Sequence, residues 1–280
     1  MNNPSVIAAV QMVSGGNLEE NLATAANLCR EAAAKGASLL CLPENFALLD
    51  SSAVVALGIE EARSARIRSF IGHLSRELGV WIVAGSIPLA ESPDNQGVTR
   101  VSSACLVFND RGECLARYDK IHLFDVNVGD ATGIYRESDR FIPGNCPVVV
   151  DSPMGVLGLS ICYDLRFPEL FVDLRNKGAE IILVPSAFTY ATGKDHWSTL
   201  LRARAIENQC YVVGINQGGQ HNATRRTWGH TMIVDPWGAV LSSLDEGEGV
   251  VIATVDRERL LNIREKMPIT EHRRFHVRMD

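Results

Sequence analysis

Three residues with complementary chemistry lie at the ends of separate apolar segments of the chain: Glu44, Lys120 and Cys162. A cysteine thiol has a reference pKa of roughly 8.5, so at neutral pH it needs a base or a nearby cation to act as a nucleophile. The glutamate can take the thiol proton, and the lysine can stabilise both the thiolate and the oxyanion of a tetrahedral intermediate. If the three side chains converge, they would form a hydrolase that works through a covalent cysteine intermediate.

Cys162 stands where the apolar segment 156–161 gives way to a polar stretch and then to a helix that opens at residues 167–169. Ligands bind at the ends of strands in α/β sheets, and we expect the tight turn at this strand end to expose the thiol. Backbone N–H groups at such a turn, that of Tyr163 among them, can bind an oxyanion. The alternative is that Cys162 is a small buried hydrophobic residue, as free cysteines often are.

The elements that would position these residues are predicted from the periodicity of apolar residues and from turn signals. Asn17 and Glu20 form an N-terminal capping pattern for a helix that ends at Gly36. Further helices are predicted at 61–78 and 194–208, besides the one that opens at 167–169. The predicted strands cover residues 5–12, 37–42, 80–87, 99–108, 113–118, 156–162, 180–184, 210–215, 231–234, 239–241 and 250–255.

Helical crossovers and hairpins are mixed along the chain, and this mixture predicts the fold class. Residues 109–112, for example, have the sequence of a hairpin turn. We expect an α/β fold in which two mixed sheets face each other with helices outside, because an eight-fold barrel would need stricter strand–helix alternation. No repeat or linker interrupts residues 1–280, so we expect one domain, with the residues after about 265 as a C-terminal tail.

Composition and charge exclude several classes of protein. Apolar residues make up 46% of the chain and charged residues 21%, which excludes disorder as the main state. The 27 basic and 33 acidic side chains give a net charge of −6. The chain therefore lacks the basic surface that nucleic acids need, and anionic membranes would repel it. No apolar run approaches the roughly 18 residues of a membrane span, so we expect neither a nucleic-acid nor a membrane partner.

The N-terminus and the cysteines favour a cytoplasmic location. Residues 1–5 lack the basic region and the cleavage site of a secretory signal. The seven cysteines are scattered and form no C-x-x-C pair, so we expect neither a disulfide framework nor a structural zinc site. His272 and His276 stand four residues apart without an evident third ligand, and we assign them to a solvated tail rather than to a metal site.

Three sequence blocks surround the candidate residues: residues 43–45 (PEN), 118–125 (YDKIHLFD) and 159–169 (LSICYDLRFPE). Further blocks stand at residues 185–188, 192–197, 201–211 and 229–238. Together these blocks, in the order glutamate, lysine, cysteine, resemble the signature of the nitrilase (carbon–nitrogen hydrolase) superfamily. The likeness spans nearly the whole chain, and it is greatest to the deaminated glutathione amidase branch.

This resemblance implies an α-β-β-α sandwich that pairs through its helical face, and hence a homodimer or a larger homo-oligomer. It also implies a Cys–Glu–Lys hydrolase that needs no metal and no organic cofactor. A second glutamate typical of these enzymes lies between the lysine and cysteine blocks, and Glu137 is the best match. Residues 128–133 lack the Pro-Gly pair common in this loop, which leaves the triad intact but bears on the loop geometry and on the fit of the substrate.

The resulting hypothesis is stepwise acyl transfer from a small-molecule amide substrate. The Cys162 thiolate attacks the amide with Glu44 as general base, while Lys120 and the Tyr163 N–H hold the oxyanion. A thioester remains when ammonia or an amine leaves, and water activated by Glu44 then releases the acid. Glu137 would orient Lys120 and the water. The resemblance implies the ω-amide of a 2-oxo acid as substrate, such as deaminated glutathione or the smaller α-ketoglutaramate.

Substrates of this kind are anionic, so a cationic side chain should face them. Arg166 and Arg202 are the candidates, and each could equally be an ion-pair partner within the fold. Three alternatives stay open. The same triad could hydrolyse a nitrile or a carbamoyl group, a cysteine protease could use Cys162 with His196 or His230, or the chain could be a non-catalytic binding module on the same scaffold.

Overall fold

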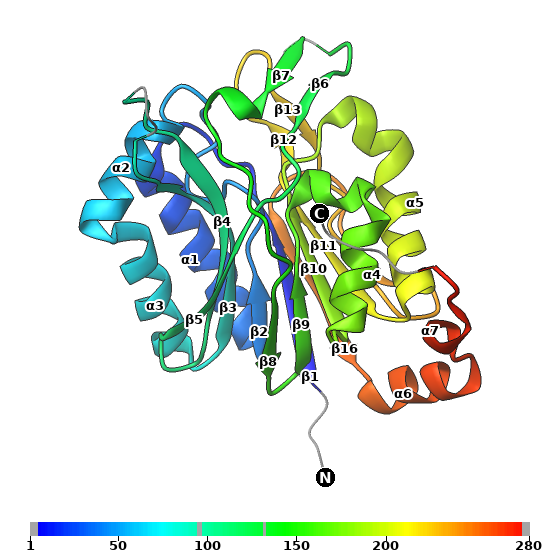
Figure 1. Cartoon of the computed structure of the whole chain (residues 1–280). Helices are drawn as coiled ribbons and strands as arrows, with labels where there is room; N and C mark the ends of the chain where they lie inside the picture. Colours follow the sequence, from blue (N-terminus) through cyan, green and yellow to red (C-terminus); the bar gives the residue numbers. More distant parts are fainter. Residues whose placement is uncertain (1–4, 94–96, 131–132, 276–280) are drawn as a thin grey trace.

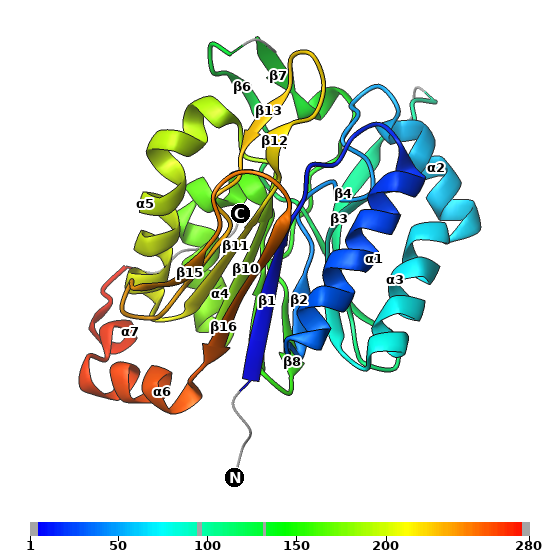
Figure 2. The ribbon, with the colours of Figure 1, turned by 180° about the vertical axis from the view of Figure 1, so that it is seen from behind.

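Two six-stranded sheets face each other at the centre of the molecule, and helices cover their outer faces (Figure 1 and Figure 2). The computed structural model describes residues 5–93, 97–130 and 133–275. The predicted α/β sandwich of two mixed sheets with outer helices is confirmed.

The first sheet has the strand order β16-β1-β2-β3-β4-β5. Its strands are β16 (Gly249–Val255), β1 (Ser5–Gln11), β2 (Leu39–Cys41), β3 (Trp81–Ala90), β4 (Val101–Phe108) and β5 (Cys114–Asp119). β1, β2 and β3 run parallel, and the other neighbours pair antiparallel. The helices α1 (Leu18–Ala34), α2 (Val54–Ser64) and α3 (Arg66–Leu78) lie on the outer side of this sheet (Figure 2).

The second sheet has the order β15-β14-β11-β10-β9-β8. Its strands are β15 (Val240–Ser243), β14 (Met232–Val234), β11 (Tyr211–Asn216), β10 (Ile181–Ser186), β9 (Gly155–Leu159) and β8 (Val149–Ser152). β9, β10 and β11 are parallel, and the remaining pairs are antiparallel. The helices α4 (Pro168–Asn176) and α5 (Tyr190–Asn208) cover its outer side, and α6 (Arg257–Lys266) and α7 (Ile269–His272) follow at the end of the chain (Figure 1).

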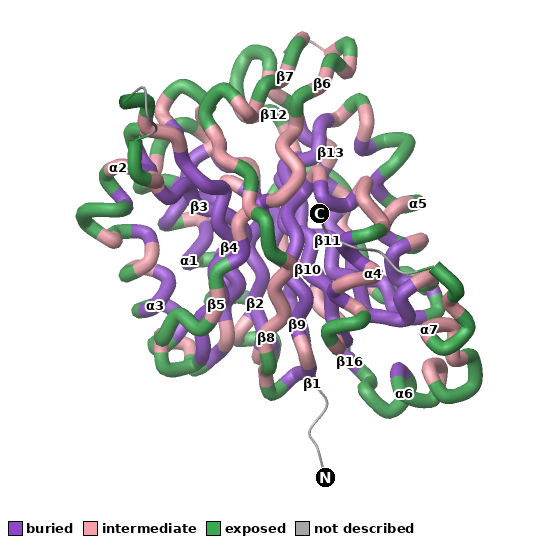
Figure 3. Tube along the Cα trace, viewed as in Figure 1, coloured by how far each residue is buried: buried purple, intermediate pink, exposed green. Residues whose placement is uncertain are grey.

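Alternation along the strands divides the core into two clusters. In β1, Ile7 and Ala9 belong to the cluster between the sheets, whereas Ala8 and Val10 belong to the cluster under α1 and α3. Successive side chains of a strand point to opposite faces, so a strand covered on both sides must be apolar throughout. β10 and β11 are accordingly buried along their whole length (Figure 3). These covered sheets give a rigid base for the loops at the strand ends.

Two small hairpins lie over one end of the sandwich (Figure 1). One consists of β6 (Asp125–Asn127) and β7 (Ile134–Arg136), and the other of β12 (Gly218–Gln220) and β13 (Arg226–Trp228). The 3-10 helices η1 (Glu137–Asp139) and η2 (Cys162–Arg166) follow β7 and β9. The carboxyl ends of the parallel strands point to this same end of the molecule, where ligand sites of α/β sheets usually lie.

The helix predicted at 61–78 is wrong in its extent, because the structure has two helices, α2 and α3, that meet at Ala65. Ala65 adopts a left-handed conformation with φ of 51°. The buried carboxylate of Glu61 accepts hydrogen bonds from the backbone N–H groups of Ile67 (2.7 Å) and Arg68 (3.1 Å). A side-chain acceptor at these free N–H groups starts a new helix, so the chain turns there although its apolar pattern continues.

Other boundaries also differ. β9 ends at Leu159 rather than at Cys162, and α5 begins at Tyr190 rather than at Lys194, where Thr189 caps it. The predictions omitted the short strands β6, β7, β8, β12 and β13 and the helices α6 and α7. The Asn17 cap of α1 is confirmed, since its side chain accepts from the N–H groups of Glu19 and Glu20.

The end of the chain is partly ordered against the sandwich. His272 is exposed on α7, and His276 lies outside the described residues. Arg273 donates a hydrogen bond to the carbonyl of Glu207 on α5 (3.2 Å). The division into one domain and a tail after about residue 265 stays a prediction. Within the ranges that the structure describes, no helix is long and apolar enough to cross a membrane.

Candidate active site

Lys120 lies just beyond β5, and its ammonium group is buried between two carboxylates. Its Nζ atom lies 2.9 Å from Oε1 of Glu44 and 2.8 and 3.0 Å from the two oxygens of Glu137. Burial would lower the pKa of the Lys120 ammonium, but the charges of Glu137 and Glu44 raise it well above its usual value. Lys120 is 1% exposed and therefore stays a fixed positive charge at neutral pH.

Glu44 follows the end of β2 and is held from the opposite sheet. Its Oε2 atom accepts a hydrogen bond from the backbone N–H of Ala187 (2.8 Å), directly after β10. Its own carbonyl accepts from the side chain of Gln217 (3.1 Å). The next residue, Asn45, has φ of 56° and donates its N–H to the Ser86 hydroxyl (3.1 Å). These contacts leave the Glu44 carboxylate little freedom to rotate, so it presents one orientation to the site.

Cys162 begins η2 in a left-handed backbone conformation, with φ of 48°. A residue other than glycine is strained in this region, so the surrounding contacts must hold it there. The thiol is 8% exposed, and the expectation that the turn exposes it is wrong. The strand β9 ends at Leu159, three residues earlier, and Cys162 packs with the apolar residues of the core between the sheets, so only the wall of a small cavity is left to the thiol.

Asp164 supplies the contacts that hold the Cys162 turn. Its Oδ2 atom accepts from the Ile161 N–H (2.8 Å) and from the Tyr118 hydroxyl (2.7 Å). Its Oδ1 atom accepts from the His122 N–H (3.1 Å) and lies 2.7 Å from His122 Nδ1. Asp164 is fully buried, so these donors compensate for the loss of water around its charge.

The electrostatics around Cys162 favour the neutral thiol. Burial raises the pKa of Cys162 well above its usual value, and the charge of Glu44 raises it further. The charge of Lys120 and the N–H of Ala187 act in the opposite direction without reversing the shift. The resting site therefore holds a thiol, and nucleophilic attack requires that a base remove its proton during the reaction.

Glu44, Glu137 and Cys162 line one cavity of about 30 Å³ at the ends of the sheets. Arg166, one of the two predicted anion-binding residues, lines the same cavity. Its guanidinium packs on the Phe188 ring, 5.1 Å from the ring centroid, and donates to His196 Nδ1 (3.2 Å). The cavity thus has a thiol, a buried carboxylate (Glu44), a partly exposed one (Glu137) and a cation on its walls, a composition suited to acyl transfer from an anionic substrate.

Arg202 and the two histidines of the protease alternative lie elsewhere. Arg202 is exposed on α5 and donates to the carbonyl of Gly238 (2.9 Å), on the turn between β14 and β15. His196 contacts Arg166, and His230 stacks on the Trp228 ring at 4.0 Å. Among the described residues, neither histidine lines the Cys162 cavity. A cysteine–histidine dyad is therefore not formed here.

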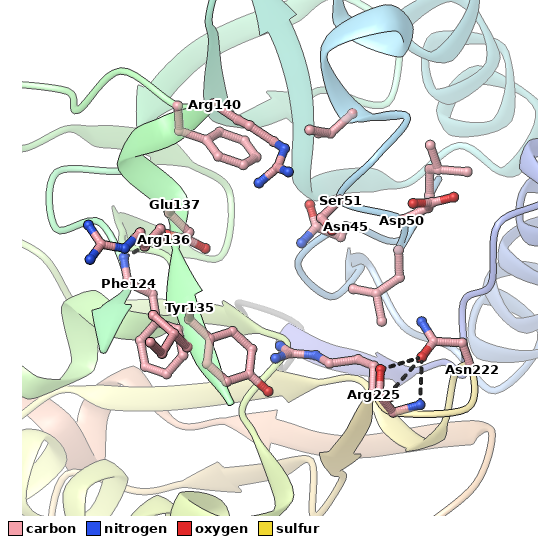
Figure 4. A pocket seen from close by; sticks show the side chains of 16 residues that line it. Asn45, Asp50, Ser51, Phe124, Tyr135, Arg136, Glu137, Arg140, Asn222 and Arg225 are labelled. Carbon is pink, nitrogen blue, oxygen red and sulfur yellow. Dashed lines mark hydrogen bonds between the residues drawn. The ribbon is translucent and has the colours of Figure 1, made fainter. Parts of the chain in front are cut away.

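Three features of the site were not predicted: the Ala187 N–H, the Asp164 network and Arg225. Arg225 lies between β12 and β13 and lines both the Cys162 cavity and a second, larger cavity of about 240 Å³. Figure 4 shows this larger cavity, with Asn45, Phe124, Glu137 and Arg225 also belonging to the smaller one. A periodic pattern could not have identified Arg225, because it lies in an irregular turn beside a second arginine.

Comparison with known proteins gives consistent matches over almost the whole chain. Residues 6–265 match the carbon-nitrogen hydrolase family. The chain is 44% identical over 271 residues to a protein of Yersinia enterocolitica named deaminated glutathione amidase, covering 96% of this chain and 93% of the relative.

Two solved structures resemble the fold closely. The NitFhit protein of C. elegans superposes with a TM-score of 0.86 at 38% identity, covering 98% of this chain and 66% of that one. Saccharomyces cerevisiae Nit3, described as a member of branch 10 of the nitrilase superfamily, superposes with a TM-score of 0.83 at 28% identity, covering 97% of both chains. These similarities agree with the sandwich architecture.

Proposed function

Because the chain belongs to the carbon-nitrogen hydrolase family, we propose that it is an amidase that cleaves the ω-amide of a small carboxylate-bearing substrate. Deaminated glutathione is the substrate that the name of its relative supports. The observation that carries the proposal is the convergence of Glu44, Glu137 and Lys120 at the cavity that holds the Cys162 thiol. In this assignment Glu44, Lys120, Cys162 and Glu137 are the catalytic residues.

The acylation half of the reaction uses the neutral thiol. As the sulfur of Cys162 attacks the amide carbon, its proton passes to Glu44, and a tetrahedral intermediate forms. The oxyanion is stabilised by the Lys120 ammonium and by the backbone N–H of Tyr163. Glu44 then gives its proton to the leaving nitrogen, the carbon–nitrogen bond breaks, and the acyl group stays on Cys162 as a thioester.

The deacylation half regenerates the enzyme. Glu44 takes a proton from a water molecule that attacks the thioester carbon, and the same donors stabilise the second oxyanion. The carbon–sulfur bond breaks, the acid leaves, and the proton returns from Glu44 to the Cys162 sulfur. Glu137 holds Lys120 through both of its oxygens, so the ammonium keeps its place while the charge on Glu44 changes.

The experiment compares deaminated glutathione and α-ketoglutaramate as substrates, with release of 2-oxoglutarate as the measurement. We expect turnover of at least one by the wild type, none by Cys162→Ala, and full activity of Cys146→Ala, a matched control at an exposed thiol. A nitrile and a ureido compound in the same panel test the related reactions of the fold. Turnover by Cys162→Ala, or faster turnover of the nitrile, would overturn the proposal.

We also propose that two copies pair through the helical face of the second sheet. Exposed apolar side chains gather there on α5, on the β14–β15 turn and on β15: Ile206, Trp237, Val240 and Leu241. Gly238 packs so closely on Ile206 that a Cβ atom would lie 2.6 Å from its Cδ1. A group of large exposed apolar residues favours burial against another surface.

Light scattering tests this pairing. The wild type should have the mass of a dimer and Trp237→Lys that of a monomer, and a monomeric wild type would exclude pairing.

A cytoplasmic location is part of the same proposal. All seven cysteines are free thiols, and four of them are buried outside the site: Cys29, Cys41, Cys105 and Cys210. Free thiols persist in a reducing compartment, where no oxidising machinery pairs them. A tagged chain should therefore fractionate with cytoplasmic markers, and fractionation with a secreted or organellar marker would contradict this location.

A further inference from the structure

The two cavities beside Cys162 differ in size and share one wall. The cavity at the thiol measures about 30 Å³, and the neighbouring cavity about 240 Å³. A volume of about 30 Å³ has room for little more than the reacting amide group itself, since one water-sized group needs roughly 10–15 Å³ on this measure. The remainder of a larger substrate must therefore extend beyond this cavity, and the larger cavity is the neighbouring space that shares its wall. Phe124, Glu137 and Arg225 lie at the junction.

Arg225 is held at this junction with one terminal nitrogen of its guanidinium unpaired. Its Nη2 atom donates to the carbonyl of Ala187 (2.8 Å), and its guanidinium lies on the Tyr135 ring, 4.8 Å from the centroid. Its Nη1 atom is buried and has no hydrogen-bond partner among the described residues. A buried donor of a charged group that lacks a partner is costly, so such an atom indicates an acceptor that the site is built to receive.

The charges around the larger cavity favour an anion. Arg140 and Arg225 reach toward the cavity from opposite sides (Figure 4). The Arg140 side chain forms no hydrogen bond or salt bridge with another residue that the structure describes. The carboxylates on the same walls form no salt bridge with Arg140 or Arg225 among the described residues, because Glu137 holds Lys120 and Asp50 accepts from the N–H (2.8 Å) and hydroxyl (2.7 Å) of Ser52. The cations of this cavity are therefore available for a ligand.

We propose that the larger cavity binds the leaving amine of the substrate and that Arg225 binds a carboxylate carried by that amine. The inference rests on the proposed amidase function, and it assigns a binding residue to each of the two ends of the substrate. Arg166, at the thiol, takes the carboxylate of the short acyl part. Arg225 takes the carboxylate at the far end, as in an amide of 2-oxoglutarate with a short peptide. Deaminated glutathione has both carboxylates, whereas α-ketoglutaramate, which releases ammonia, has only the first.

The test measures kcat/KM for three substrates: deaminated glutathione, the same molecule with its C-terminal carboxylate converted to a carboxamide, and α-ketoglutaramate. Arg225→Gln should lower kcat/KM for deaminated glutathione by about 10- to 100-fold, the range expected for a charge-assisted hydrogen bond. The other two substrates should change by less than about threefold, because they lack the group that Arg225 binds. Arg225→Lys should restore part of the preference for deaminated glutathione over its carboxamide, since lysine retains the positive charge but not the two parallel N–H donors of the guanidinium.

The matched control is Arg226→Gln, the next residue on the same hairpin. Arg226 is exposed, pairs with Glu246 (2.9 Å) and lies on the Tyr190 ring, and it lines neither cavity. This variant should leave all three kcat/KM values within about twofold of the wild type, as a surface substitution does.

Each other outcome overturns the inference in a recognisable way. An equal loss for all three substrates with Arg225→Gln would mean that Arg225 acts by positioning Ala187, and hence Glu44, rather than by binding the amine. Unchanged kcat/KM for deaminated glutathione would remove Arg225 from substrate binding while the amidase function stands. A wild type that hydrolyses none of the three would refute the proposed function itself, and the assignment of the two ends with it.

Discussion

The Oε2 atom of Glu44 lies 2.8 Å from the backbone nitrogen of Ala187, and this contact joins the ends of the two sheets at the site. Glu44 follows β2 in the first sheet, and Ala187 follows β10 in the second. The other carboxylate oxygen binds Lys120 (2.9 Å). The Glu44 carboxylate is thus oriented by residues that follow strands of both sheets. The distance between the two sheets therefore determines where this carboxylate can give or take a proton.

The first prediction concerns Glu44→Gln. Glutamine can accept from only one of Ala187 and Lys120, because its amide nitrogen is a donor, and it cannot take up the thiol proton. The kcat should therefore fall by about 10²- to 10⁴-fold. The charge of Glu44 raises the pKa of Cys162, so the same substitution should lower that pKa. Steady-state kinetics and the ultraviolet absorbance of the thiolate measure the two effects.

The variant should therefore hold more thiolate and yet react more slowly. Circular dichroism should show an unchanged fold, because Lys120 keeps its contacts with Glu137. A variant with wild-type kcat would show that Glu44 does not transfer the proton. An unchanged pKa of Cys162 would show that the charge of Glu44 does not affect the ionisation of the thiol.

The second prediction concerns the resting state of Cys162 in the wild type. Its pKa is raised well above 9.0, so the thiol remains protonated across the neutral range and ionises only in strongly alkaline solution. The difference in thiolate absorbance between the wild type and Cys162→Ala should show no step below pH 9. A step in acidic or neutral solution would indicate a preformed thiolate ion pair and would remove the need for a base.

The third prediction concerns Asp164, whose carboxylate holds the Cys162 turn. In Asp164→Asn an amide nitrogen replaces one acceptor and faces a donor, either the Ile161 N–H or the His122 N–H. The free energy of unfolding should fall by about 2–4 kcal/mol, the cost of leaving buried donors unpaired, and kcat should fall with it. Urea unfolding and kinetics provide the measurements.

Asp173→Asn is the matched control for Asp164, since Asp173 lies on α4 and pairs with Lys177 at the surface (3.3 Å). It should change the free energy of unfolding by less than about 1 kcal/mol. Tyr118→Phe removes one donor to Asp164 and leaves the carboxylate, so its effect should be smaller than that of Asp164→Asn. Equal stability of Asp164→Asn and the wild type would show that the conformation of the Cys162 turn does not depend on the hydrogen bonds of Asp164.

The fourth prediction concerns His221, whose pKa is lowered from 6.5 to about 4, chiefly by burial and partly by the charge of Arg225. Its Nδ1 lies 2.8 Å from the Ser14 carbonyl and its Nε2 2.6 Å from the Thr227 hydroxyl, which fits a neutral ring. As the pH falls from 6.5 to 4, the unfolded chain gains a proton that the folded one does not. The folded state should therefore lose about 3 kcal/mol of stability over this range.

His221→Gln should remove this part of the pH dependence, because glutamine does not titrate and can form both hydrogen bonds. The measurement is urea unfolding at several pH values, in which the wild type should lose stability more steeply than the variant. His272→Gln, at an exposed position on α7, should leave the wild-type slope unchanged. Parallel curves for the wild type and His221→Gln would show that the ring is not held neutral.

The strand ends that carry Glu44 and Cys162 could be predicted because apolar runs of strand length mark the buried parallel strands β2 and β9, whose ends lie at the same side of the fold. The strand before Lys120, β5, is mostly exposed and antiparallel to β4, and the hairpin turn at residues 109–112 predicts it. The contact between Lys120 and Glu137 followed from the family resemblance, since no periodicity connects η1 with β5. The break at Ala65 could not be predicted, because the apolar pattern continues through it. The Glu61 carboxylate accepts from the first N–H groups of α3, but in the sequence Glu61 cannot be distinguished from an ordinary glutamate within a helix.

Arg225 shows where such reasoning ends. Its neighbours are polar and its segment forms a short hairpin, so its sequence is typical of a solvated turn. Its place at the site depends on contacts with Ala187, which follows β10, and with Tyr135 of β7. Contacts between irregular loops arise from the packing of the whole chain, and local patterns do not contain them.

Part of the wall that the two cavities share belongs to a segment outside the sandwich. Phe124 and Glu137 flank β6 and β7, which pair with each other as a small sheet of their own. Insertions within that hairpin would leave the six-stranded sheets and the position of Cys162 undisturbed. Changes in the length of this hairpin can therefore alter which substrate binds without altering the residues that cleave the amide bond.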